Sequence, residues 1–108
     1  MRQVRLWLLR RRGVQVTATA TGLGAWYASN PRGPGLMVYT VQVSWTDADG
    51  PHTGDRQYAF WGKDTSTQQD FLGFIHDPGG VVVRFPRGRP HRFALDIPFS
   101  PRMSDQLL

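Results

Sequence analysis

The sequence predicts a mainly β fold: a five-stranded, OB-like or SH3-like small barrel with one short helix between the third and fourth strands. Apolar and polar residues alternate with a period of two in several segments, as in half-buried strands, whereas one segment has helical spacing. The 12 Gly and 8 Pro among the 108 residues separate these segments with turns. This order of elements is that of an OB-fold, and a plain sandwich with a packed helix is a further alternative. The length fits a single domain, residues 1–108.

The first two strands are predicted from the clearest alternation. Residues 14–21 alternate Val or Ala with Gln or Thr, and Gly22 and Gly24 then interrupt the pattern, which indicates a bulge or a bend. Residues 38–45 alternate in the same way. The intervening segment, Asn30–Gly35, is rich in Pro and Gly and predicts a turn. Together these segments predict one long hairpin with its tip at Asn30–Gly35.

A turn at Asp47–Pro51 separates this hairpin from a third predicted strand, Arg56–Trp61. The period then changes, because the following apolar residues recur at i, i+3 and i+4. Ser66 is the predicted N-cap, since Gln69 follows it at the spacing of a capping box. The sequence therefore predicts a short helix over residues 66–76.

The fourth and fifth strands are predicted at residues 81–85 and 93–97, with a Pro-bounded turn between them. Residues 1–12 form either a basic N-terminal arm or a short helix, and residues 98–108 a loose C-terminal tail. The residues that we expect to be mainly buried lie on the apolar faces of these elements. They are Val14, Val16, Ala18, Tyr39, Val41, Val43, Tyr58, Phe60, Phe71, Ile75, Val81, Val83, Phe93, Leu95 and Ile97.

The charge of the chain is segregated along the sequence. The formal net charge is +5, the cations are nearly all Arg, and every acidic residue is Asp. Residues 1–12 and 84–108 are basic, and residues 13–83 are acidic. Such asymmetry favours an anionic partner, namely nucleic acid, an anionic membrane surface or a protein with an acidic surface. The alternative is that the basic ends cover the acidic middle of the same chain.

Composition excludes several classes of protein. The chain has no Cys, which excludes disulfides, thiolate metal sites and cysteine nucleophiles. No apolar run approaches the ~20 residues of a membrane span, and Leu6–Leu9 is short for the core of a signal peptide. We therefore expect a cytoplasmic protein without a membrane span, for which peripheral membrane association stays open.

No set of residues predicts catalysis. His52, His76 and His91 are not spaced as metal ligands on one face, and no Ser lies in a nucleophile elbow. His76 and Asp77 are the one neighbouring acid–base pair, without a nucleophile or an oxyanion hole in the pattern around them. We expect no enzyme, no cofactor and no metal.

The binding hypothesis rests on the loops of an OB-like barrel, where ligands usually meet the first and last turns and the second and third strands. The candidate binding residues are Arg32, Trp61, Arg87, Arg89 and His91. Pro86 and Pro90 bracket a turn that should keep Arg87 and Arg89 exposed. The favoured interpretation is a non-enzymatic protein-interaction or structural module whose partner has an acidic surface. Binding of nucleic acid or another polyanion through the basic loops is the alternative, and the oligomeric state is left open.

Short pieces of the sequence also point to a family. They are residues 12–18 at the first strand, 39–45 at the second, 47–50 at the turn, and 81–86 with 89–90 near the end. Over residues 12–97 the chain resembles the small β-domain of unknown function carried by many bacterial membrane-anchored proteins. It departs from that family at Phe85-Pro86, where Tyr-Asp-Pro is typical, and its sequence lacks the flanking membrane helices. The resemblance implies a β-barrel-like domain and no catalytic residues.

Overall fold

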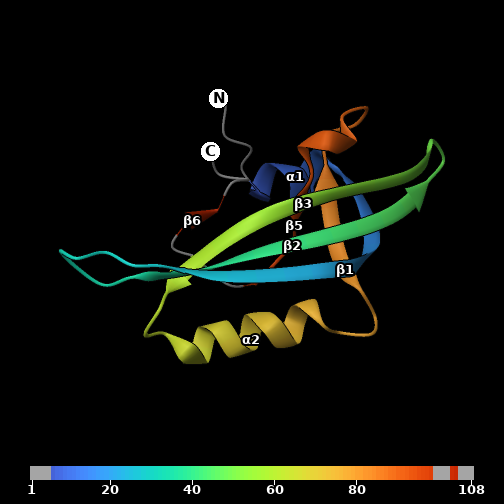
Figure 1. Ribbon diagram of the computed structural model, residues 1–108. Coiled ribbons are helices and arrows are strands. Elements are labelled where there is room, and N and C mark those ends of the chain that lie inside the picture. The colour runs from blue at the N-terminus through green and yellow to red at the C-terminus, as the bar shows by residue number, and fades with distance from the viewer. Residues whose placement is uncertain (1–5, 99–102, 105–108) are drawn as a thin grey trace.

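The computed structural model describes residues 6–98 and 103–104 (Figure 1). Its elements follow the predicted order, with additions at both ends. They are α1 (Leu6–Arg12), β1 (Val14–Ala28), β2 (Leu36–Asp47), β3 (Gly50–Trp61), α2 (Thr65–Ile75), β4 (Val81–Phe85), the 3-10 turn η1 (Pro90–Arg92), β5 (Ala94–Leu95) and β6 (Met103–Ser104).

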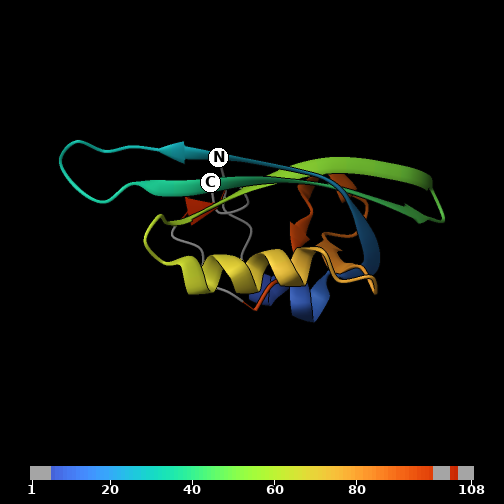
Figure 2. The same cartoon turned by 60° about the horizontal axis from the view of Figure 1, so that its bottom comes forward.

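The strands form one antiparallel sheet in the order β5-β4-β1-β2-β3-β6, which confirms a mainly β fold. β1, β2 and β3 are a long meander, and the first part of β1 curls away to pair with β4 (Figures 1 and 2). The result is a curled half-barrel. Among the described residues the outermost strands, β5 and β6, do not pair with each other. Each has two residues, which is too short to close a barrel.

The predicted long hairpin is confirmed, because β1 and β2 pair from Thr19↔Ser44 to Ala28↔Leu36. The register shifts between Ala20 and Gly22, so the predicted interruption is a β-bulge. The tip is closed by Asn30, whose side chain accepts a hydrogen bond from the Arg32 amide over 3.0 Å. The tip of the hairpin projects past the rest of the molecule (Figure 1).

β3 begins at Gly50, six residues before the predicted start at Arg56. Gly50 takes a φ of 114°, which favours glycine, and the Asp47 carboxylate accepts the Asp49 amide over 2.9 Å to form the tight turn. The strand then pairs with β2 along its whole length. Pro51 is tolerated because it stands at the start of a strand that lies near the edge of the sheet.

Helix α2 begins one residue before the predicted Ser66. Asp64 is the N-cap, and its side chain accepts a hydrogen bond from the Thr67 amide over 3.2 Å. Ser66 therefore lies in the first turn instead of capping it. Asp and Ser are similar N-caps, so the sequence pattern alone does not separate these two starts.

α2 covers one face of the sheet and supplies the centre of the core (Figure 2). The Phe71 ring lies 5.7, 5.4 and 5.0 Å from the rings of Tyr39, Tyr58 and Phe60, measured between centroids. Gln68, also buried, accepts a hydrogen bond from the Tyr39 hydroxyl over 2.8 Å and donates one to the carbonyl of Trp61. Its polar groups are therefore satisfied inside the core.

A second aromatic cluster fills the other end of the half-barrel. Trp45 stacks on Phe85 and meets Phe93 edge-on, with ring centroids 5.9 and 5.2 Å apart. A Cβ on Gly54 would lie 2.4 Å from the Phe93 ring, so glycine allows this ring to rest on the backbone of β3. All the residues predicted to be buried are so, except Val14 and Val16, which are partly buried. These two lie where β1 curls out to meet β4.

The ends of the described chain are more ordered than expected from the sequence. Of the two forms considered for residues 1–12, the helix is observed as α1, and Leu9 is buried. In the predicted tail of residues 98–108, Met103 and Ser104 form β6 beside β3. Residues 1–5, 99–102 and 105–108 lie outside the described part of the chain.

Candidate functional site

The two basic ends of the chain lie against each other. α1 packs beside β4, and Asp96 joins them through ion pairs with Arg10 and Arg84. The Nε–H group of Arg10 donates a hydrogen bond to one carboxylate oxygen of Asp96 over 2.8 Å, and the Nε–H group of Arg84 donates one to the other oxygen over 2.6 Å. Among the described residues no ion pair connects either basic end to the acidic segment between them. The charge segregation seen in the sequence therefore persists in the fold.

Arg10 and Arg84 hold the Asp96 carboxyl group in its ionised form, although Asp96 is partly buried. Burial alone would raise the pKa of its carboxyl group, but the hydrogen bonds and charges of Arg10 and Arg84 outweigh burial and lower the pKa. The pKa of Arg10 is raised, chiefly by its hydrogen bond to Asp96. Asp96 neutralises part of the local positive charge and fixes α1 on β4.

The turn between β4 and η1 presents the predicted cations to solvent. Gly88 has a φ of 78°, and the Arg89 amide donates to the Pro86 carbonyl over 2.9 Å, which closes the turn. Arg87, Arg89 and His91 are exposed, which confirms the predicted exposure of the two arginines. We call the exposed cations of this turn and of α1 the basic end. It consists of Arg10, Arg11, Arg12, Arg87, Arg89 and Arg92.

Arg56 holds η1, which follows this turn, against β3. Its Nε donates to the Phe93 carbonyl and its Nη2 to the His91 carbonyl, each over 2.9 Å. Its guanidinium carbon also lies 3.8 Å from the centroid of the Phe93 ring, a cation–π geometry. The sequence analysis did not single out this residue. The available signal was its position on the apolar face of β3, two residues before Tyr58.

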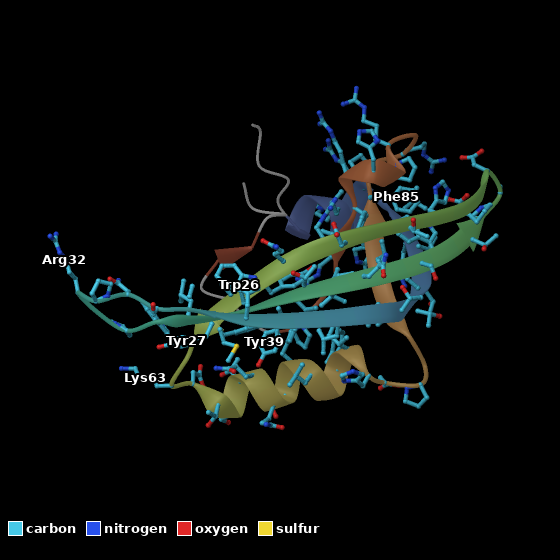
Figure 3. All side chains as sticks on the ribbon, viewed as in Figure 1. Trp26, Tyr27, Arg32, Tyr39, Lys63 and Phe85 are labelled. Carbon is cyan, nitrogen blue, oxygen red and sulfur yellow. The ribbon has the colours of Figure 1, made fainter. Side chains whose placement is uncertain are left out.

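The remaining two predicted binding residues lie elsewhere. Arg32 stands at the tip of the β1–β2 hairpin, away from the β4–η1 turn (Figures 1 and 3). Trp61 ends β3 opposite Leu36 and is half-buried. The structure thus brings Arg87, Arg89 and His91 together on one turn and separates them from Arg32 and Trp61.

The projecting hairpin, which we define as residues 19–36 because its tip extends past the rest of the molecule, carries exposed apolar side chains that the sequence analysis did not select. Leu23, Trp26 and Tyr27 are the exposed large apolar side chains of the described chain, with exposed fractions of 39, 54 and 56%. Trp26 and Tyr27 point to opposite faces of the sheet (Figure 3). The Tyr27 ring lies over Gly35 and Gly62, where a Cβ would come within 2.3 and 2.7 Å of ring carbons.

The hairpin also has a free edge. β4 pairs with β1 at Val14–Ala18 only, and β2 occupies the other side of β1. Among the described residues no strand lies along the outer edge of Thr19–Ala28. In Figure 2 this part of β1 forms the upper rim of the sheet, with α2 well below it.

His52 and His76 each make a hydrogen bond inside the chain. His52 Nε2 lies 2.9 Å from Asp47 Oδ1, a hydrogen bond that lowers the pKa of Asp47, and the His52 ring stacks on Trp45. His76 contacts the Leu72 carbonyl at the end of α2, and Asp77 accepts the Gly79 amide in the next turn. The described part of the chain holds no group of three or more His, Asp or Glu side chains placed to bind a metal ion.

Comparisons of the chain with protein-family models, curated proteins and solved structures give no match. No helix in the described residues is both long and apolar enough to cross a membrane.

Proposed function

We propose that the protein is a non-enzymatic interaction module and that its partner binds the projecting hairpin. One observation carries this proposal: the exposed large apolar side chains of the described chain all lie on one short stretch of this hairpin. Exposed apolar residues that are scattered singly need no explanation, whereas these three gather on both faces of one strand segment, as at a strand that is covered by a partner. Trp and Tyr are also enriched in protein interfaces and at their energetic centres.

The placement of the hairpin supports the same proposal. α2 packs on β2 and β3 through Phe71, and residues 19–28 of β1 are exposed or half-buried, so this part of β1 contributes little to the core. An element that contributes little to the core can change its surface residues for binding with little effect on the stability of the fold. Arg32 at its tip favours a partner with an acidic surface, as the charge pattern predicts.

The test is site-specific photo-crosslinking in cells of the natural host. A photoreactive phenylalanine analogue replaces Trp26, which keeps an aromatic ring at an exposed position. The matched control places the same analogue at Gln15, which is exposed on the other part of the same strand. We expect discrete adducts from position 26 and none from position 15. If position 26 gives no adduct, the hairpin is not the interaction surface.

A second candidate function, binding of nucleic acid or another polyanion, is favoured by the packing of α1 beside β4, the strand that leads into the β4–η1 turn. This contact collects cations from both ends of the sequence on the basic end. It suits contacts with phosphates more than base stacking, because the rings nearby are buried in the core. The OB-like assignment of the half-barrel, which would place a ligand against the β4–η1 turn, stays part of this second proposal.

The second candidate predicts a defined response to substitution. Replacing Arg87 and Arg89 with Ser should weaken oligonucleotide binding and lower the slope of log K against log salt by about two units. Melting should change little, because exposed charges contribute ~0–1 kcal/mol. Arg32→Ser, which removes an exposed cation from the hairpin tip, is the matched control and should leave binding unchanged. If the parent binds no oligonucleotide at low salt, this candidate is wrong.

A further inference from the structure

We propose that the partner at the projecting hairpin is a second copy of this chain, which pairs antiparallel through the outer edge of Thr19–Ala28. This inference rests on the proposed function and specifies its partner. The sheets of the two copies would then form one continuous sheet across a two-fold axis, and β1 of one copy would pair with β1 of the other. The same surface on both copies makes such an interface self-complementary.

The edge is open along a length that suits strand pairing. β4 stops opposite Ala18, and Thr19–Ala28 remain in strand conformation beyond it. At ~3.3 Å per residue this segment offers an edge of roughly 30 Å. Residues in an antiparallel strand alternately direct their N–H and C=O groups to either side, so every second residue here presents both groups outward. A strand from another chain would satisfy these groups.

Apart from the bulge between Ala20 and Gly22, the sequence of this edge contains none of the usual protection against pairing. Natural edge strands carry charges, Pro or a short length to prevent association. Thr19–Ala28 has no charged residue and no Pro, although the chain as a whole has a net charge of +5 and 8 Pro. The outer edge of β3 differs, because it carries Pro51, Asp55 and Arg56, and β5 and β6 are two residues each. The long uncharged edge of β1 is therefore the one adapted for pairing.

Charge complementarity favours a second copy over an unrelated strand. A Cβ on Gly80 would lie 2.6 Å from the Ala18 carbonyl, so the turn before β4 stands at the inner end of the free edge. Asp77 in that turn is exposed, and Arg32 is exposed at the outer end. Antiparallel pairing brings the outer end of each copy toward the inner end of the other. Arg32 then approaches Asp77 of the second copy, and within the described residues neither has an ion-pair partner in its own chain.

Pairing would also cover the exposed apolar side chains. Leu23 and Tyr27 lie on the face that carries α2, and Trp26 lies on the opposite face. With the strands antiparallel and ~4.7–4.9 Å apart, each of these side chains gains a neighbour from the second copy on its own face. The same contact thus accounts for both the apolar surface and the bare edge.

The test is sedimentation velocity of the purified full chain over a range of concentrations. We expect a dimer in the parent protein and a shift to monomer in Gly24→Lys, with affinity reduced about tenfold or more, because two like charges meet at the paired edge. A Cβ at Gly24 has no heavy atom within 4 Å in its own chain, so the folded monomer should tolerate the side chain. Circular dichroism and the urea midpoint check that the variant is folded.

Gly73→Lys is the matched control. It makes the same substitution at another glycine whose Cβ would meet nothing within 4 Å, on the exposed side of α2. This variant should remain dimeric. A parent that is monomeric at all concentrations, or a dimer that persists in Gly24→Lys, would overturn the proposal. Adducts with a different protein from position 26 in cells, together with a monomeric chain in solution, would retain the proposed function and reject self-pairing.

The natural absence of Cys allows a second, independent readout. Single Cys substitutions at successive positions from Gly22 to Trp26 are oxidised mildly, and disulfide-linked dimers are measured. Opposite Cα atoms in an antiparallel pair are ~4.5–5.5 Å apart, which a disulfide can span. We expect linkage to peak at the position on the two-fold axis and to fall on both sides. A flat profile would indicate random collision and would contradict the proposed pairing.

Discussion

Phe71 is the side chain through which α2 is held on the sheet, so its truncation should have a large effect. It is fully buried, and its ring contacts three other aromatic rings within 5.7 Å between centroids. Removing a buried Phe to Ala costs about 3–5 kcal/mol, and aromatic pairs contribute about 0.5–1.5 kcal/mol each beyond area burial. Phe71→Ala should therefore lose about 4 kcal/mol. Phe71→Leu keeps most of the apolar volume and should lose about 1–2 kcal/mol.

The assay is urea unfolding followed by far-UV circular dichroism. A domain of this size has ~5–15 kcal/mol of stability, so Phe71→Ala leaves it marginal and should lower Tm by about 15 °C or more. Phe71→Leu remains measurable if the Ala variant does not fold. A loss below about 1 kcal/mol in Phe71→Ala, or equal losses in the two variants, would show that α2 is not anchored by this ring.

Two further predictions follow from close contacts. Gly54→Ala should destabilise the protein more than Gly73→Ala, since its Cβ would fall 2.4 Å from the Phe93 ring whereas a Cβ at Gly73 meets nothing; thermal melting compares them. Asp96 has a pKa below its ordinary value in the folded state, so its contribution to stability is present above the unfolded pKa of ~3.9 and is lost as pH falls through the lowered value. Asp96→Asn should therefore reduce stability at neutral pH and flatten the acid limb of the stability–pH profile. An unchanged acid limb would contradict the ion pairs of Asp96.

Local patterns predicted the local features of the fold. Both hairpins, the bulge beside Gly22 and the helix between β3 and β4 follow from alternation, glycine and turn residues. The early start of β3 did not, because His52, Gly54 and Arg56 occupy its inward positions and break the apolar alternation. They are accommodated by contacts with the distant Phe93 and Trp45, which no window of β3 reveals.

In the candidate sites, too, features with a local sequence signal could be predicted and features set by distant contacts could not. The exposure of Arg87 and Arg89 could be predicted because the prolines that bracket the turn lie beside them in the sequence. The ion pair of Arg10 with Asp96 joins residues 86 positions apart and has no local signal. The exposure of Leu23 and Tyr27, which lie on the face that carries α2, depends on how far α2 covers that face, and this is decided by tertiary packing. Alternation predicts that a residue is on a face, not whether that face is covered.

The connection of β1 to two neighbours also sets an order for folding. β1, β2 and β3 follow one another directly in the chain and are joined by short connections, whereas β4 reaches β1 only after β3 and α2 intervene in the chain. Long-range pairing is slower than local pairing because more chain entropy must be lost first. We therefore expect the β1–β2–β3 meander to form before β4 pairs with β1. During that interval the bare edge extends from Val14 to Ala28, and prompt docking of β4 limits aggregation of newly made chains.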